Sequence, residues 1–253
     1  MMLTRDELEE YRHVLGFNLW QIEKDYLQHL LLLFLYQRAG RNLVFKGGTA
    51  LQKGYALNRF SIDLDFTSTD GEARRLIQNV SRDITSFGFR AVIGEGERTR
   101  TTRVIKAKIE GPLYDGGERT MTTLRLEISA RRDVLLEPVA KEIVPVYADL
   151  RPYVTVMMDL REMLAEKVRA LVWRAEAKDL YDLWFLTRKN VKWDVTLVDR
   201  KLSYYRLKFN KDAFLGKVSG LKEAWPVELK AAVSTLPPFE VAQLDIRQAI
   251  SEI

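Results

Sequence analysis

The chain has 253 residues, 47% of them hydrophobic and 30% charged, so it can form a packed core under a charged surface, and global disorder is excluded. Its 40 basic and 35 acidic residues leave a formal net charge of +5, which is compatible with a polyanionic partner but does not identify one. The absence of cysteine excludes disulfides and thiolate metal sites. The longest uncharged apolar run, residues 30–36, is too short to cross a bilayer, and the N-terminus lacks a signal-peptide layout. We therefore expect a cytoplasmic protein without membrane contact.

Two helices are expected at the N-terminus. Thr4 and Glu7, three residues apart, form a capping box that opens the first helix. The second begins at Asn18 and ends at Gly40, because asparagine favours helix starts and glycine commonly follows helix ends.

A strand, a helix and a second strand follow closely. Residues 43–45 are a short apolar run, and Gly47 with Gly48 forms the turn that leads into the helical segment TALQKGYAL. Residues 61–67 alternate strictly between apolar and polar side chains, which is typical of a strand. The polar side of this strand carries Asp63 and Asp65.

The remaining pattern predicts more strands and then only helices. Asp70 caps a further helix, and the alternating runs RTTRVIKAKIEG and MTTLRLEISA, joined around Asp115, predict a hairpin. EPVAKEIVPVY predicts an edge strand, because edges tolerate proline. From Asp159 onward the period is helical. We therefore expect an α+β protein with a mixed sheet flanked by helices over residues 1–158, followed by a helical C-terminal domain over residues 159–253.

The glycines and the two aspartates define a candidate site. A strand, a glycine turn and a helix start expose backbone N–H groups that bind phosphate oxygens, and Thr49 adds a hydroxyl. Carboxylates two residues apart on a strand project the same way, about 7 Å apart, and can hold divalent cations jointly with substrate phosphates. Either feature alone is more often a plain turn or a solvated strand face. Together they predict phosphoryl or nucleotidyl transfer.

KGGTAL followed by RFSIDLDF resembles the signature of the DNA polymerase β-type nucleotidyltransferase superfamily. The resemblance implies a nucleotidyltransferase fold, with two Mg²⁺ ions held by Asp63 and Asp65. That superfamily places a third carboxylate on a neighbouring strand, and Glu127 in TLRLEIS matches it. Candidate nucleotide-binding residues are Lys46, Gly47, Gly48, Thr49, Arg59 and Ser61.

Residues 164–186, LAEKVRALVWRAEAKDLYDLWFL, are similar to the AbiEii/AbiGii-type toxin nucleotidyltransferase family. In that family a helical lysine and a later aspartate belong to the active site, and Lys167 and Asp179 match them. The resemblance implies that Lys167 neutralises the triphosphate and that Asp179 accepts the acceptor's proton or positions the acceptor. The resemblance covers roughly residues 43–186, and within it the spacing between Gly48-Thr49 and Asp63 is somewhat longer than in the family's tightest form.

The resemblance implies transfer of a nucleoside monophosphate from an NTP to an acceptor hydroxyl by the toxin of a toxin–antitoxin pair. The implied partners are the NTP, a cognate antitoxin and an RNA acceptor such as the 3′ end of tRNA. Other classes stay open: a catalytically silent nucleotide-binding module, a protein that only binds partners, and a metal-dependent nuclease using Asp65 and Glu127. The nuclease is disfavoured because Ser129 stands where such sites commonly have lysine.

Overall fold

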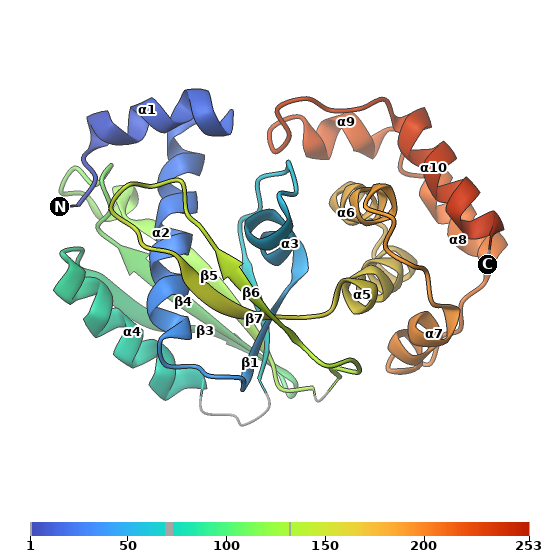
Figure 1. Ribbon diagram of the computed structural model, residues 1–253, viewed down its shortest axis with the longest axis horizontal. Helices are drawn as coiled ribbons and strands as arrows, with labels where there is room; N and C mark the ends of the chain where they lie inside the picture. Colours follow the sequence, from blue (N-terminus) through green and yellow to red (C-terminus); the bar gives the residue numbers. More distant parts are fainter. Residues whose placement is uncertain (1, 69–72, 132, 253) are drawn as a thin grey trace. The chain divides into compact units, whose positions relative to one another are not determined.

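The computed structural model describes residues 2–68, 73–131 and 133–252 (Figure 1). The chain forms two compact units. The first comprises Met1–Ala56, Phe60–Arg132 and Pro138–Met157, and the second comprises Leu57–Arg59, Asp133–Glu137 and Met158–Ile253. Two short segments that precede residue 158, Leu57–Arg59 and Asp133–Glu137, thus pack with the second unit, which the chain order did not predict. Asp70, the expected helix cap, lies outside the described residues.

Within the described residues, the first unit is built on a seven-stranded sheet in the order β3–β4–β5–β2–β1–β7–β6. The central strand β2 is antiparallel to β1 and parallel to β5, and β1 is parallel to β7. The outer pairs, β3 with β4, β4 with β5 and β6 with β7, are antiparallel. The strands are β1 (Leu43–Lys46), β2 (Leu64–Ser68), β3 (Ala91–Arg98), β4 (Thr102–Ile109), β5 (Thr122–Ser129), β6 (Val139–Ile143) and β7 (Tyr153–Met157). The mixed sheet confirms the α+β class.

The predicted hairpin and edge strand are both present. β4 and β5 pair in antiparallel register, with a short 3-10 helix, η1 (Glu118–Thr120), before β5, and β6 lies at one edge of the sheet. β2 begins at Leu64, three residues later than expected. β3 and β7 were not predicted. β3 contains two glycines and several charges and is largely exposed, and β7 is a short run directly before a helix.

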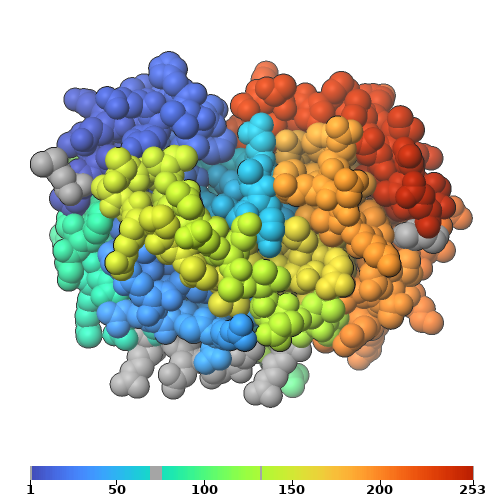
Figure 2. Space-filling view, viewed as in Figure 1, coloured from blue at the N-terminus to red at the C-terminus, as the bar shows by residue number. Residues whose placement is uncertain are grey.

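Four helices of the described first unit accompany the sheet: α1 (Arg5–Leu15), α2 (Leu19–Tyr36), α3 (Gly47–Tyr55) and α4 (Ala73–Phe87). The capping box of Thr4 and Glu7 is confirmed, and Asn18 caps α2. α2 crosses one face of the sheet, contacts β5 and β7, and packs against α4 (Figure 1). In Figure 2 the yellow-green segment between β6 and β7 covers part of the blue α2, in agreement with the edge-on packing of Tyr147 against Tyr26 at 5.0 Å.

The second unit, in its described part, contains only helices: α5 (Leu160–Trp173), α6 (Ala177–Arg188), α7 (Val195–Ser203), α8 (Lys211–Ser219), α9 (Ala224–Leu229) and α10 (Phe239–Ser251). Residues 133–137 belong to it because Glu162 accepts the N–H groups of Leu135 and Leu136, at 2.8 and 2.9 Å, and Lys201 donates to the Asp133 carbonyl at 2.6 Å. Across the described parts of both units, no helix has the length and apolar character needed to span a bilayer.

A polar cluster is buried where α2 meets α3 and the β6–β7 segment. Asp25 and Lys53 form an ion pair there, and the Tyr147 hydroxyl donates to Asp25 at 2.9 Å. The Nδ1 atom of His29 lies 2.8 Å from the Tyr153 hydroxyl. Burial lowers the pKa of His29 to about 3; Lys53 acts in the same direction and Asp25 opposes it. His29 is therefore neutral in the folded protein near pH 7.

The neutral His29 is expected to make the fold acid-sensitive. Below pH ~6.5 the unfolded chain protonates this histidine while the folded chain does not until about pH 3, so the free energy of unfolding falls by about 1.4 kcal/mol per pH unit in this window. In urea titrations, His29→Gln should therefore lose about 2 kcal/mol less stability than wild type between pH 7.5 and 5. His13→Gln, at the exposed histidine of α1, is the control and should keep the wild-type slope. An unchanged slope in His29→Gln would contradict the assignment.

Candidate functional site

The sheet brings three of the predicted carboxylates and a lysine together. Asp65 on β2 is in parallel register with Glu127 on β5 and in antiparallel register with Lys46 on β1. Residues paired in this way project from the same face of neighbouring strands. Asp63 lies two residues before Asp65, immediately ahead of the first strand residue, and so shares that face.

Arg125 lies among these carboxylates and was not predicted. Its guanidinium forms an ion pair with Glu127 and approaches Asp63, with 3.6 Å between Arg125 Nη1 and Asp63 Oδ2. The three side chains are between 33% and 41% exposed, so they remain accessible. The sequence could have indicated Arg125, because it precedes Glu127 by two residues on the same strand and both side chains therefore lie on one face of the sheet.

Gly47 and Gly48 are the first two residues of α3, so the expected glycine turn is in fact the start of a helix. Gly47 has φ +77°, and a Cβ atom at this position would lie 2.5 Å from Oδ2 of Asp65. Lys46, the N-cap residue of α3, makes no side-chain hydrogen bond that caps the helix. The start of α3 therefore lies beside the Asp65 carboxylate, and a helix N-terminus of this kind is a general binding site for phosphate.

Thr49 supports Asp63 through the backbone. Its side chain is fully buried, and its hydroxyl donates to the carbonyl oxygen of Asp63. The sequence suggested a direct phosphate contact for this hydroxyl, but in the structure its hydrogen is already donated within the protein.

The segment before β2 is held by side chains because it has no strand partner. Gln28, buried on α2, donates to the carbonyls of Ser61 and Ile62 at 3.0 and 2.9 Å. Gln52 on α3 accepts the Ser61 N–H at 2.9 Å. Ser61, a predicted substrate contact, is itself buried. Gln28 and Gln52 were not predicted, although a glutamine within an otherwise apolar helix is a recognisable signal.

Replacing Gly47 by alanine should damage this site more than the fold. The added Cβ would displace the Asp65 carboxylate, and misplacement of a catalytic group by about 1 Å can lower the reaction rate roughly 10²-fold. The effect on the free energy of unfolding should be limited to about 1–2 kcal/mol, which is the cost of a left-handed backbone for a non-glycine residue. Steady-state transfer assays and thermal melts check this. The control is Gly216→Ala on α8, where nothing lies within 4 Å of the added Cβ. Unchanged transfer by Gly47→Ala would remove the argument for a tight site.

A second group of predicted residues meets inside the helical unit. Lys167 Nζ lies 2.9 Å from Asp179 and 2.8 Å from Asp182, and Arg174 lies 2.8 Å from Asp179. Arg59 donates from Nε and Nη2 to the two oxygens of Asp182, at 2.8 and 2.9 Å. Arg59 is therefore grouped with Lys167 and Asp179 and belongs to a different unit from Ser61.

Mutual pairing keeps this group charged. Burial alone would lower the pKa of Lys167, but Asp179 and Asp182 outweigh it and raise that pKa above its usual value. Burial would likewise raise the pKa of Asp179, but Lys167 and Arg174 hold it well below its usual range. Asp179 is thus a weak base.

The donor set of the first unit fits a hard divalent cation. Asp63, Asp65 and Glu127 supply carboxylate oxygens, which Mg²⁺ prefers. Among the described residues, no group of three acidic or histidine side chains already has the geometry of a formed metal site. Arg125, a cation, sits between two of these carboxylates.

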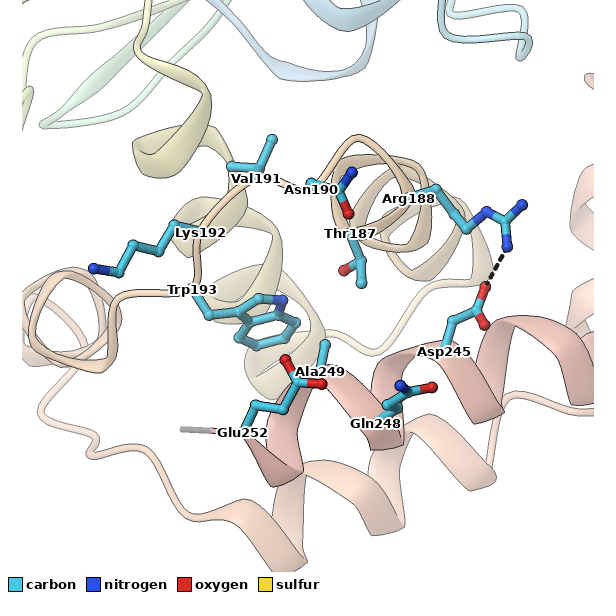
Figure 3. A pocket seen from close by; sticks show the side chains of 10 residues that line it. All are labelled: Thr187, Arg188, Asn190, Val191, Lys192, Trp193, Asp245, Gln248, Ala249 and Glu252. Carbon is cyan, nitrogen blue, oxygen red and sulfur yellow. Dashed lines mark hydrogen bonds and ion pairs between the residues drawn. The ribbon is translucent and has the colours of Figure 1, made fainter.

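The helical unit also contains a cavity of about 620 Å³ (Figure 3). An ion pair between Arg188 and Asp245, 3.5 Å apart, lies at one side of it. The other lining residues are Thr187, Asn190, Val191, Lys192, Trp193, Gln248, Ala249 and Glu252. No predicted site residue lines it, so it is distinct from both groups above.

The mixed sheet carries carboxylates on neighbouring strands, next to a helix that begins with two glycines. This arrangement defines the nucleotidyltransferase class of fold. The particular family follows from the sequence: the family model described as "Nucleotidyl transferase AbiEii toxin, Type IV TA system" matches residues 32–250. The chain therefore belongs to the AbiEii family of toxin nucleotidyltransferases, as its motifs indicated.

Solved structures agree with this fold. MenT4, a nucleotidyltransferase toxin from Mycobacterium tuberculosis, superposes with a TM-score of 0.70 at 21% identity, over 98% of this chain and 89% of that one. JHP933 from Helicobacter pylori superposes with a TM-score of 0.63 at 20% identity, over 93% of this chain and 92% of that one. A further H. pylori protein gives 0.61 at 22% identity, over 89% and 93% of the two chains. Among curated proteins, none matches the chain significantly.

Proposed function

We propose that this toxin nucleotidyltransferase transfers a nucleoside monophosphate from an NTP to an acceptor hydroxyl in a Mg²⁺-dependent reaction that releases pyrophosphate. The observation that carries the proposal is the register of Asp65 with Glu127, with Asp63 two residues earlier, beside the start of α3. These three carboxylates would hold two Mg²⁺ ions, which when bound supply neutralising charge for the triphosphate and acidify the acceptor hydroxyl.

The chain's own residues orient the nucleotide. The N–H groups at Gly47 and Gly48 bind the terminal phosphates, and Lys46, opposite Asp65, adds positive charge. In the helical unit, Lys167 neutralises the leaving pyrophosphate. The lowered pKa of Asp179 favours positioning of the acceptor over acceptance of its proton. Ser61 and Arg59 contribute indirectly: the Ser61 N–H donates to Gln52 next to the aspartate strand, and Arg59 pairs with Asp182 in the helical unit.

The acceptor in this proposal is an RNA, the 3′ end of tRNA, and the cell compartment is the cytoplasm. The net charge of +5 is compatible with a polyanionic acceptor. The family description names a type IV toxin–antitoxin system, which supports a cognate antitoxin as partner. In this scheme residues 1–158 form the nucleotidyltransferase domain and residues 159–253 the helical domain.

The test is to incubate the purified protein with Mg²⁺, total tRNA and each α-³²P-labelled NTP in turn, beside an Asp63→Asn control. Label on tRNA with wild type alone establishes the reaction, the acceptor class and the preferred base. Mg²⁺-dependent NTP binding without transfer to tRNA would refute the RNA acceptor while keeping the nucleotide site. Shortened RNA would instead favour a nuclease.

A further inference from the structure

One face of α2 packs against the chain segment that leads to Asp63. Trp20, Lys24 and Gln28 are spaced four residues apart and so share this face. Gln28 donates to the carbonyls just before Asp63. Burial lowers the pKa of Lys24 and the Asp63 carboxylate opposes this shift, so the ammonium group lies within the field of Asp63.

Trp20, the first of these side chains, is exposed yet held in place. It is 47% exposed, whereas Phe60, which its ring meets at 5.9 Å in an edge-on contact, is only 3% exposed. Phe17 supports Phe60 at 5.3 Å, and Lys24 Nζ lies 4.9 Å from the centre of the Trp20 ring. A large aromatic surface is thus kept rigid in solvent by contacts that the free protein already makes.

This exposed surface adjoins the carboxylates. The link is the segment before Asp63: the Trp20 ring meets Phe60 at 5.9 Å, and Gln28 on the same helix face donates to the carbonyls of Ser61 and Ile62. Ile62, the residue before Asp63, is also 47% exposed. The apolar surface suits a flat aromatic ring, and the neighbouring carboxylates suit phosphates bound through a divalent cation. A nucleotide combines these two groups.

We propose that Trp20 is a stacking platform for a nucleobase, with Lys24 fixing its ring and adding positive charge beside it. Every nucleobase offers a π-face that an aromatic side chain can stack on, and a nearby cation favours the phosphates that accompany it. The assignment rests on the proposed function, because a nucleotide must be bound at the neighbouring carboxylates. The base belongs either to the incoming NTP or to the acceptor RNA.

Paired ligands separate stacking from phosphate binding. The affinities of wild type, Trp20→Ala and Trp20→Phe are measured by calorimetry in Mg²⁺ for each NTP, for inorganic triphosphate and for total tRNA. Trp20→Ala should bind an NTP or tRNA about tenfold more weakly and inorganic triphosphate unchanged, and Trp20→Phe should retain most of the affinity. Trp173→Ala, at an exposed tryptophan of the helical unit, is the matched control and should resemble wild type.

The pattern of losses identifies the base. A loss for NTP alone assigns the stacked base to the donor nucleotide, and a loss for tRNA alone assigns it to the acceptor. Unchanged affinity for both, or an equal loss for inorganic triphosphate, would overturn the assignment. A parallel label-transfer assay tests the proposed function itself: transfer by wild type with an unaffected Trp20→Ala refutes only the stack, whereas base-specific binding without transfer refutes only the reaction.

Discussion

Replacing Asp65 by asparagine is expected to abolish nucleotidyl transfer, with a loss of at least ~10³-fold in kcat/KM, which corresponds to about 4 kcal/mol of transition-state stabilisation. Asparagine keeps the shape of the side chain but removes the charge that a hard divalent cation needs. Asp65 is the carboxylate in register with Glu127 and closest to the start of α3, so no neighbour can take its place. The transfer assay with labelled NTP measures the loss.

The accompanying variants make this result specific. Asp63→Asn should be as inactive as Asp65→Asn, with a melting temperature near wild type because Asp63 is partly exposed. Glu127→Gln tests the third carboxylate and should show a smaller loss, since Glu127 is paired with Arg125. Asp83→Asn, which removes a surface ion pair with Arg38, is the control and should stay active. Near-normal transfer by either Asp63→Asn or Asp65→Asn would refute the metal assignment.

The second large effect is expected on stability. Asp182→Asn should lower the free energy of unfolding by about 3–5 kcal/mol, because it leaves the buried cations of Arg59 and Lys167 without a shared counter-charge. The Asp182 side chain is fully buried and binds both partners at 2.8 Å. Urea or thermal unfolding measures the change.

Two further variants distinguish a buried charge effect from general damage. Glu240→Gln removes an exposed ion pair with Lys222 and should leave stability unchanged within error. A double variant, Arg59→Met with Asp182→Leu, should recover part of the loss, because it removes the buried Arg59 cation together with its partner while Lys167 keeps Asp179 as a counter-charge. If Asp182→Asn is as stable as wild type, the buried network does not hold the helical unit together.

Lys167 and Asp179 are expected to serve both the reaction and the stability of the helical unit. The segment that contains them resembles the active-site motif of the AbiEii family, and their side chains are also held within a buried network of ion pairs in the helical unit. Variants at these positions are best judged by transfer measured on protein shown to be folded, because a loss of stability alone would mimic a catalytic defect.

Much of the fold could be predicted from local sequence patterns. The capping box at Thr4, the helix start at Asn18, the β4–β5 hairpin, the edge strand β6 and the helical second half are all present. Such features depend on residues close together in the chain, whose spacing matches the period of a helix or strand. β3 was not predicted because its glycines and charged residues weaken the alternation of apolar and polar side chains. β7 was not predicted because a run of five residues shows little periodicity.

The sequence by itself determined the class of protein and the residue types of its site: the family motifs, the aspartate pair and the glycines before a helix. Only the tertiary structure decided their partners. In the structure, Glu127 and Lys46 lie beside Asp65, and Arg125 lies between Glu127 and Asp63. The Thr49 hydroxyl donates to the Asp63 carbonyl, and Arg59 forms an ion pair with Asp182. These contacts join residues far apart in the chain, and they depend on strand register and on burial, because a buried charge or donor must find whichever partner the packing brings near.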